Sequence, residues 1–410
     1  MFLTRPQSFV APDDRDFSAY PFATRKALAL AARLEVGRLT VTMPDAHGFS
    51  FGAGQLGPQA HILIRDHRFA MRLAAEGEVG AAESYLRGEW DTPDLTKVIE
   101  LLSLNHAVIE NLLRDRPFTR LRQLFAHWLN RNTKTGSRRN IAAHYDLGNP
   151  FYASWLDRTM TYSSAVFASP GEDLASGQAR KYRELASRIA LSANDHVLEI
   201  GCGWGGFAEY AARETGCRVT AITISQAQYE FARERIFRAG LAEKVSVELR
   251  DYRDETGLYD KIASIEMFEA VGEAFWPGYF RQLRDRLRPG GLAGLQVITI
   301  KETVFAHYRR EIDFIRRYIF PGGMLPTFSI LRDMGVRHGL PLTTDFHFGQ
   351  DYARTLVQWR EGFRSAWPLL TRQGFDERFR RMWEFYLAYC EAGFRTGQID
   401  VSQMVFAKLS

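Results

Sequence analysis

The feature that most constrains this fold is a short apolar strand that leads directly into a glycine-rich turn. The run 196–200 has the character of a buried strand, and Gly201, Gly203 and Gly205 follow it before a helix that begins near Phe207. Glycine lets the backbone turn sharply and approach a bound molecule closely. The pattern predicts one strand-to-helix unit of a parallel sheet with a ligand at the turn, and a turn without ligand is the alternative.

From residue 140 onward the chain alternates short apolar runs with helical stretches, which is typical of a parallel sheet covered on both faces. The expected strands are 196–200, 218–223, 245–249, 259–265 and 292–298, with a late strand at 403–407. We therefore predict an α/β, Rossmann-like fold with a mainly parallel sheet at residues 140–410. Residues 1–113 mix strand-like and helical runs and predict a small N-terminal α+β domain.

The surroundings of the turn indicate which ligand it takes. A dinucleotide site needs a carboxylate on the ribose at the end of the second strand, but residues 221–225 read Ala-Ile-Thr-Ile-Ser. The turn also lacks the Gly-Lys-Ser/Thr ending that a nucleoside triphosphate requires. Both absences favour S-adenosylmethionine as the ligand.

Separate motifs along the chain make this interpretation specific. Besides the loop 199–206, they are AHYDLGN at 143–149, MTYSS at 160–164, AITISQAQ at 221–228, DYRD at 251–254, MFEAVG at 267–272, YIFPGG at 318–323 and FGQDY at 348–352. Together they resemble the cyclopropane fatty-acyl-phospholipid synthase family of S-adenosylmethionine-dependent methyltransferases. The resemblance spans nearly all of residues 140–410 and implies a class I methyltransferase fold.

The resemblance also implies which residues bind the methyl donor. They are Tyr162, Ser163, Glu199, Gly201, Gly203, Trp204, Gly205, Thr223, Ile224, Gln228, Asp251 and Tyr252. The tyrosine–serine pair would flank the methionine part, Thr223 with Gln228 would contact the ribose, and Asp251 with Tyr252 would frame the adenine. Hydroxyl, amide and aromatic groups suit those partners, and an ordinary packing or capping role is the alternative for each.

The acceptor implied by the resemblance is a cis double bond in an acyl chain of a membrane phospholipid. The implied base is a bound bicarbonate, at the positions Ser164, Glu269, Gln296, Ile298 and Tyr352. Ser164 stands where cysteine is usual and Gln296 where histidine is usual, but both can still donate hydrogen bonds to an oxyanion. Glu269 is the leading catalytic candidate, either as a partner of bicarbonate or as the base itself; a helix N-terminal carboxylate is the alternative.

These departures, together with Ala270 in place of a histidine, leave the product open. An alkene is a poor nucleophile, so the site must place it against the sulfonium methyl and stabilise a carbocation. Tyr308, Tyr318 and Tyr352 are the aromatic candidates, with Tyr308 and Tyr318 expected to contact substrate. Loss of a proton from the transferred methyl closes a cyclopropane, whereas loss from an adjacent chain carbon gives a methyl- or methylene-branched unsaturated chain.

Residues 114–139 carry eight basic residues and one acid, in a chain of net charge +5. Five apolar residues fall on one side at helical spacing: Leu121, Leu124, Phe125, Trp128 and Leu129. The pattern predicts a basic amphipathic linker helix that binds an anionic phospholipid surface. A helix that packs on its own protein is the alternative.

The rest of the sequence limits where the protein works. No run reaches the roughly 18 to 20 apolar residues of a membrane-spanning helix, the N-terminus lacks a secretory signal, and the three cysteines are far apart in sequence. We expect a cytoplasmic enzyme that is peripherally bound to the inner face of the membrane, without metal or nucleic acid, and a homodimer as a further expectation. A methyltransferase for a soluble small molecule and a lipid-binding protein without catalysis are the rival hypotheses.

Overall fold

The computed structural model describes residues 9–10, 17–52, 56–106 and 147–409. The chain divides into two compact units. The smaller unit takes residues 1–126, 311–314 and 371–398, and the larger unit takes 127–310, 315–370 and 399–410. The predicted linker helix at 114–139 lies outside the described residues, as do residues 143–146 of the first motif.

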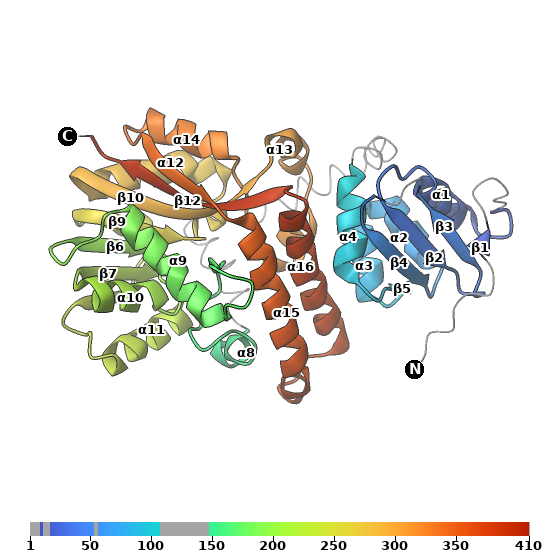
Figure 1. The fold of residues 1–410 in the computed structure, drawn as a ribbon, viewed down its shortest axis with the longest axis horizontal. Coiled ribbons are helices and arrows are strands. Elements are labelled where there is room, and N and C mark those ends of the chain that lie inside the picture. The colour runs from blue at the N-terminus through green and yellow to red at the C-terminus, as the bar shows by residue number, and fades with distance from the viewer. Residues whose placement is uncertain (1–8, 11–16, 53–55, 107–146, 410) are drawn as a thin grey trace. The chain divides into compact units, whose positions relative to one another are not determined.

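The larger unit is built on a seven-stranded sheet (Figure 1). Its strands are β6 (His196–Ile200), β7 (Arg218–Thr223), β8 (Val245–Leu249), β9 (Tyr259–Ile265), β10 (Leu287–Ile300), β11 (Leu342–His347) and β12 (Ile399–Ala407). Their order is β11-β12-β10-β9-β6-β7-β8, and only the pairings of β12 with β10 and β11 are antiparallel. The predicted α/β class with a mainly parallel sheet is confirmed.

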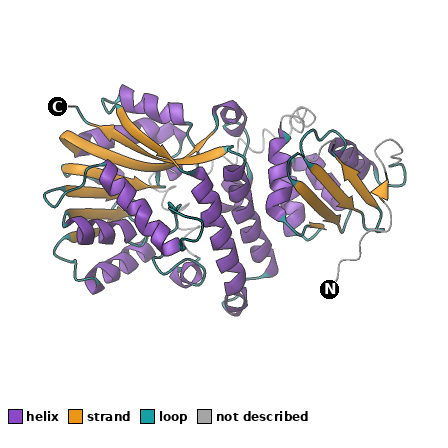
Figure 2. Cartoon of the chain, in the orientation of Figure 1, coloured by secondary structure: helices purple, strands orange, loops and turns teal. Residues whose placement is uncertain are grey.

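Helices cover both faces of this sheet (Figure 2). Along β6, Val197 packs into the core cluster of one face and Leu198 into that of the other, as expected from the side-chain alternation of a strand. The first face is covered by α9 (Leu174–Arg188), α10 (Gly206–Thr215) and α11 (Gln226–Arg238), and the second by α12 (Trp276–Arg286) and α14 (Phe328–Arg337). The other α-helices in the described part of this unit are α8 (Asn149–Ala153), α13 (Glu302–Tyr308) and α15 (Gly349–Arg372).

The smaller unit is an α+β structure, also as predicted. Its strands are β1 (Phe9–Val10), β2 (Arg38–Thr42), β3 (Gly48–Phe51), β4 (Gln59–Ile64) and β5 (Trp90–Asp91), in the order β1-β3-β2-β4-β5. Its helices are α1 (Phe22–Ala31), α2 (Arg68–Glu76), α3 (Glu78–Leu86), α4 (Leu95–Leu104) and α16 (Glu377–Arg395). No helix in the described part of the chain is long and apolar enough to cross a bilayer.

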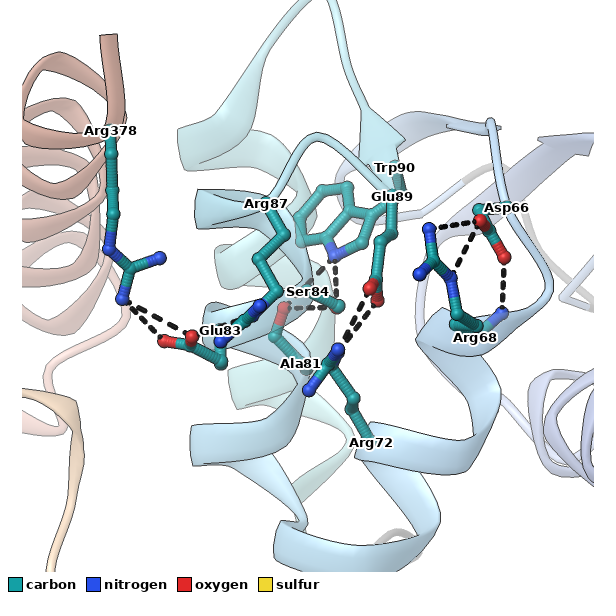
Figure 3. A network of polar contacts seen from close by, with 10 residues as sticks. All are labelled: Asp66, Arg68, Arg72, Ala81, Glu83, Ser84, Arg87, Glu89, Trp90 and Arg378. Carbon is teal, nitrogen blue, oxygen red and sulfur yellow. Dashed lines mark hydrogen bonds and ion pairs between the residues drawn. The ribbon is translucent and has the colours of Figure 1, made fainter. Parts of the chain in front are cut away.

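Helix α16 belongs to the smaller unit although the sequence analysis grouped it with residues 140–410. Arg378 forms an ion pair with Glu83 of α3 at 3.0 Å (Figure 3). Arg381 donates to the carbonyl oxygens of Tyr85 and Trp90 at 2.6 and 3.0 Å. Partners almost 300 residues away leave no local pattern in the sequence, so the assignment of this helix required the structure.

Candidate active site

The predicted site residues gather at the carboxyl ends of the parallel strands in the larger unit. Glu199 lies near the end of β6, Thr223 ends β7 and Gln296 lies in β10, and Glu266, which was not predicted, directly follows β9. Ligands of open α/β sheets bind at this edge because the strand-to-helix loops open there.

The backbone of the glycine loop after β6 turns sharply. Gly201, Gly203 and Gly205 have φ values of +82°, +53° and +81°, a left-handed region that favours glycine. A Cβ added at Gly201 would lie 2.7 Å from Cγ of Met267, whereas one added at Gly203 would meet nothing within 4 Å. The loop therefore presents open space above Gly203, as a ligand site requires.

Glu199 places a buried carboxyl group beside this loop. Its side chain is 3% exposed, and Oε2 has no hydrogen-bond partner among the described residues. Burial raises the pKa of this carboxyl to about 8, against the opposing charges of Arg235 and Lys181. A buried carboxylate oxygen left without a donor fits an ammonium group, such as the one on the methionine part of S-adenosylmethionine.

Tyr162 packs against aromatic rings, and Ser163 is held by a hydrogen bond. The ring of Tyr162 is surrounded by Tyr152, Trp155 and Trp359, with centroids 5.3, 5.7 and 5.1 Å away. The hydroxyl of Ser163 accepts a hydrogen bond of 2.6 Å from Nζ of an amine on α9. The predicted methionine-flanking pair thus combines a cluster of aromatic rings around Tyr162, called the aromatic wall below, with a serine hydroxyl that is fixed by a hydrogen bond.

The amine on α9 is Lys181, a residue that the sequence analysis missed. It is completely buried, and burial lowers its pKa to about 7 although Glu266, Asp157 and Glu199 favour the charged form. Its neighbours at helical spacing, Gly177 and Leu185, are also buried. A lysine on the apolar face of a helix was the available signal, because such a position is costly unless a carboxylate lies near.

The residues predicted to hold the ribose are close together at the end of β7. Oγ1 of Thr223 donates to Oε1 of Gln228 at 2.9 Å, and Ile224 is half-buried beside them. Trp204 is 3% exposed, and its Nε1 donates to Oδ1 of Asn149 at 2.8 Å. The tryptophan therefore ties the glycine loop to α8.

Asp251 and Tyr252 follow β8. The Asp251 carboxylate accepts from Nε and Nη2 of Arg253 at 2.9 and 2.6 Å. Tyr252 is half-buried, with its ring 5.3 Å from that of Tyr279, and burial raises its pKa to about 12. The aromatic face and the acid that were predicted to frame the adenine are adjacent, and the arginine forms an ion pair with the acid.

Three of the five residues predicted to hold a bicarbonate converge on one carboxylate. Oε1 of Glu266 accepts from the backbone N–H of Ser164 at 2.9 Å and from Nε2 of Gln296 at 2.7 Å. Oε2 accepts from the hydroxyl of Tyr352 at 2.6 Å. The Ser164 hydroxyl, by contrast, donates to the carbonyl of Ala165 at 2.9 Å.

Glu266 was missed by the sequence analysis. Its φ of +50° lies in the left-handed region, which is unusual for a residue other than glycine. Such a backbone costs roughly 1–3 kcal/mol and persists where the surroundings enforce it, often at functional sites. A second acid three residues before Glu269, directly after a buried strand, was the signal that could have identified it.

Glu269 and Ile298, the other two predicted residues, bond to each other. The Ile298 N–H donates to Oε1 of Glu269 at 2.5 Å, and Oε2 is buried without a partner among the described residues. Burial and the charge of Glu266 raise the pKa of Glu269 to about 8. Burial also raises the pKa of Glu266, but the hydrogen bonds from Tyr352, Ser164 and Gln296 and the charge of Lys181 oppose this rise. Of the two carboxyls, Glu266 is therefore the better place for a negative charge, and Glu269 is the protonated partner.

Folding stability should record this raised pKa. A carboxyl with a pKa of 4.5 when unfolded and about 8 when folded stabilises the fold at low pH. That stabilisation declines between these two values, because the unfolded chain then binds fewer protons. The free energy of unfolding of Glu269→Gln, measured with denaturant at pH 5, 6.5 and 8, should therefore rise relative to that of the unmodified protein as the pH increases. The change is at most about 1.4 kcal/mol per pH unit. A difference that is constant with pH would contradict the assignment.

Tyr308 and Tyr318 lie on separate short helices. Helix α13 ends at Tyr308, and a π-helical turn follows at Ile315–Ile319. The guanidinium of Arg316 lies 4.3 Å from the ring centroid of Tyr308 and donates to its carbonyl oxygen at 2.6 Å. The face of this ring therefore already carries a cation, and substrate contact by both tyrosines stays a prediction.

A glycine loop with open space, an unpaired buried carboxylate oxygen and a polar end of β7 define a site for S-adenosylmethionine. Comparison with known proteins agrees. The sequence profile of the mycolic acid cyclopropane synthetase family matches residues 132–404. The chain is 40% identical to the tuberculostearic acid methyltransferase of Mycobacterium tuberculosis, over 93% of this chain and 92% of that protein. It is 35% identical to the cyclopropane-fatty-acyl-phospholipid synthase of Escherichia coli, over 85% and 88%.

Solved structures show the same relationship. A mycolic acid cyclopropane synthase complexed with S-adenosylhomocysteine and CTAB superposes with a TM-score of 0.62 at 27% identity, covering 66% of this chain and 98% of that one. The protein is therefore an S-adenosylmethionine-dependent methyltransferase of class I fold. The chain belongs to the mycolic acid cyclopropane synthetase family, whose curated relatives include cyclopropane synthases and fatty acid methyltransferases.

Proposed function

We propose that the enzyme transfers a methyl group from S-adenosylmethionine to a cis double bond in an unsaturated acyl chain of a membrane phospholipid. The observation that carries this proposal is the extent of the similarity. It covers 92% and 88% of two relatives whose names specify a fatty acid and a fatty-acyl-phospholipid. A shared methyl-donor domain alone would leave the acceptor undefined.

The aromatic wall at Tyr162 supports alkene chemistry. When bound, S-adenosylmethionine supplies an electrophilic methyl group, and its transfer to a double bond leaves a cation on the acyl chain. Aromatic faces attract a desolvated cation, and Tyr162 contacts the rings of Tyr152, Trp155 and Trp359. This wall is suited to stabilise positive charge without supplying a nucleophile that would capture it.

The product that we propose is a branched unsaturated acyl chain, methyl- or methylene-substituted, rather than a cyclopropane. Two observations favour it. The relative named for methylation is more similar, at 40%, than the synthase named for cyclopropane formation, at 35%. Ser164, Gln296 and Ala270 also depart from the pattern implied for ring closure, and the position of a base decides which proton is removed.

The proposed site of action is the cytoplasmic face of the membrane, with the enzyme bound peripherally. The support is the basic, apolar-sided sequence 114–139, which suits an anionic phospholipid surface. Homodimer formation and independence of nucleic acid complete this proposal.

Vesicle assays test the substrate class. We expect labelled methyl groups from S-adenosylmethionine to enter the acyl chains of vesicles that contain anionic, cis-unsaturated phospholipid. Vesicles of the matched saturated phospholipid are the control and should stay unlabelled. Transfer to a free unsaturated fatty acid but not to the vesicles would contradict a phospholipid substrate. No labelling of any unsaturated chain would contradict acyl-chain methylation altogether.

A further inference from the structure

The donors expected to hold a bicarbonate are already directed at a side chain of the protein. A bicarbonate at this position would need the Gln296 amide and the Tyr352 hydroxyl, and both donate to Glu266. The Ser164 backbone N–H also donates to Glu266, and the Ser164 hydroxyl donates to the Ala165 carbonyl. The Ile298 N–H donates to Glu269. The residues present therefore do not fit a bicarbonate, because a carboxylate of the same charge and similar shape takes its hydrogen bonds.

A further layer of contacts fixes the direction of these bonds. Nε2 of Gln403 on β12 donates to Oε1 of Gln296 at 3.2 Å and to the carbonyl of Lys181 at 3.0 Å. With its oxygen engaged in this way, the Gln296 amide must turn its NH2 group toward Glu266. The cluster is thus arranged to receive a negative charge at Glu266.

The geometry points to Glu266 as the proton acceptor of the reaction, built into the chain in the place of bicarbonate, and to an enzyme that needs no bicarbonate. This inference rests on the proposed function. Ser164 and Gln296 are fully buried and Tyr352 is 6% exposed, whereas Glu266 is half-buried, so Glu266 is the most accessible residue of the cluster. The strained φ of +50° shows that the fold tolerates a cost to place a carboxylate there.

The proton step balances without a further reactant. The π electrons of the double bond form the new C–C bond to the methyl carbon, and the C–S bond breaks with its electrons on sulfur, releasing S-adenosylhomocysteine. The carbocation then loses a proton from a neighbouring chain carbon to a carboxylate oxygen of Glu266, and the electrons of that C–H bond form the new double bond of a methyl-branched chain. For a methylene branch, a hydride first shifts from the methyl-bearing carbon to the cation, and the proton then leaves from the transferred methyl. Glu266 returns the proton to water after the product leaves.

Bicarbonate dependence tests the inference. The unmodified enzyme should methylate unsaturated phospholipid at the same rate in carbon dioxide-depleted buffer and in buffer with millimolar bicarbonate. Glu266→Gly should lower turnover by about 100-fold or more in depleted buffer, in line with the loss of a general base. Added bicarbonate should restore part of the rate, because the glycine leaves the three donors free. Glu266→Gln should be as slow and should not be restored, because its amide fills the same space.

Controls separate this from misfolding and from a wrong substrate. Glycine adopts the backbone of residue 266 without strain, so Glu266→Gly should bind S-adenosylmethionine as the unmodified enzyme does. Ala190→Gly, at an exposed residue with φ +48°, removes a similar strain away from the site and should leave the rate unchanged. A tenfold loss of unmodified activity without bicarbonate would overturn the inference alone, as would a fully active Glu266→Gly in depleted buffer. An unmodified enzyme that is inactive on lipid in both buffers would overturn the proposed function and this inference with it.

Discussion

Replacing Gly203 with leucine should weaken S-adenosylmethionine binding by about 100-fold, or about 2.7 kcal/mol, while the protein stays folded. A Cβ added at this position would meet no atom within 4 Å beyond its chain neighbours, so a leucine side chain has room to extend into the space where the donor is expected. Isothermal titration calorimetry measures the affinity directly.

A matched variant separates this blockage from backbone strain. Gly240 also has a positive φ, +67°, and open space around it, in the turn between α11 and β8. Gly240→Leu should therefore lower the free energy of unfolding about as much as Gly203→Leu does, by roughly 1–2 kcal/mol. It should bind the donor with the affinity of the unmodified protein. Equal affinities in the two variants would show that the loop does not face the donor.

Replacing Lys181 with methionine should lower turnover by about 100-fold at neutral pH, the size expected when a general base is lost. The lysine favours ionised Glu266 and, together with Arg235, ionised Glu199, and it anchors Ser163. Without it the pKa of both carboxyls rises further, so that a smaller fraction of each is ionised at neutral pH. One then fails to attract the ammonium group of the donor, and the other fails to accept a proton.

The pH profile distinguishes this electrostatic role from a packing role. Because the carboxyls of Lys181→Met ionise only at higher pH, the rate of the variant should recover partly as the pH rises toward 9. A loss caused by poor packing would be the same at every pH and would contradict the role. Lys244→Met is the control, since Lys244 is exposed and donates only to the Gly216 carbonyl among the bonds observed. Its profile should match that of the unmodified enzyme.

The elements that were predicted correctly are those whose patterns are local. The strand His196–Ile200, the three glycines and the helix after them follow one another directly in the sequence. The structure has all three as expected. Strand β11, Leu342–His347, was missed because it lies at the edge of the sheet and its residues are only half-buried or exposed.

Several residues of the site were predicted from the sequence, but Glu266 at its centre was not. The family resemblance indicated Ser164, Gln296 and Tyr352, but the residue on which they converge could not be found from spacing. Tyr352 and Glu266 are 86 residues apart, and their hydrogen bond depends on how α15 packs beside the end of β9. A resemblance to a family also directs attention to the positions that its members share. The roles of Glu266 and Lys181 depend on the residues that surround them in space, and only the structure shows which residues those are.

The most direct test of the account identifies where the transferred carbon goes. The enzyme is incubated with cis-unsaturated phospholipid vesicles and S-adenosylmethionine carrying a ¹³C methyl group, and the released fatty acids are analysed by mass spectrometry and ¹³C NMR. We predict one labelled carbon attached to a carbon of the former double bond, in a branched unsaturated chain. A labelled ring carbon alone would contradict the proposed product, and an acyl chain without label would contradict the central claim that this enzyme methylates phospholipid acyl chains.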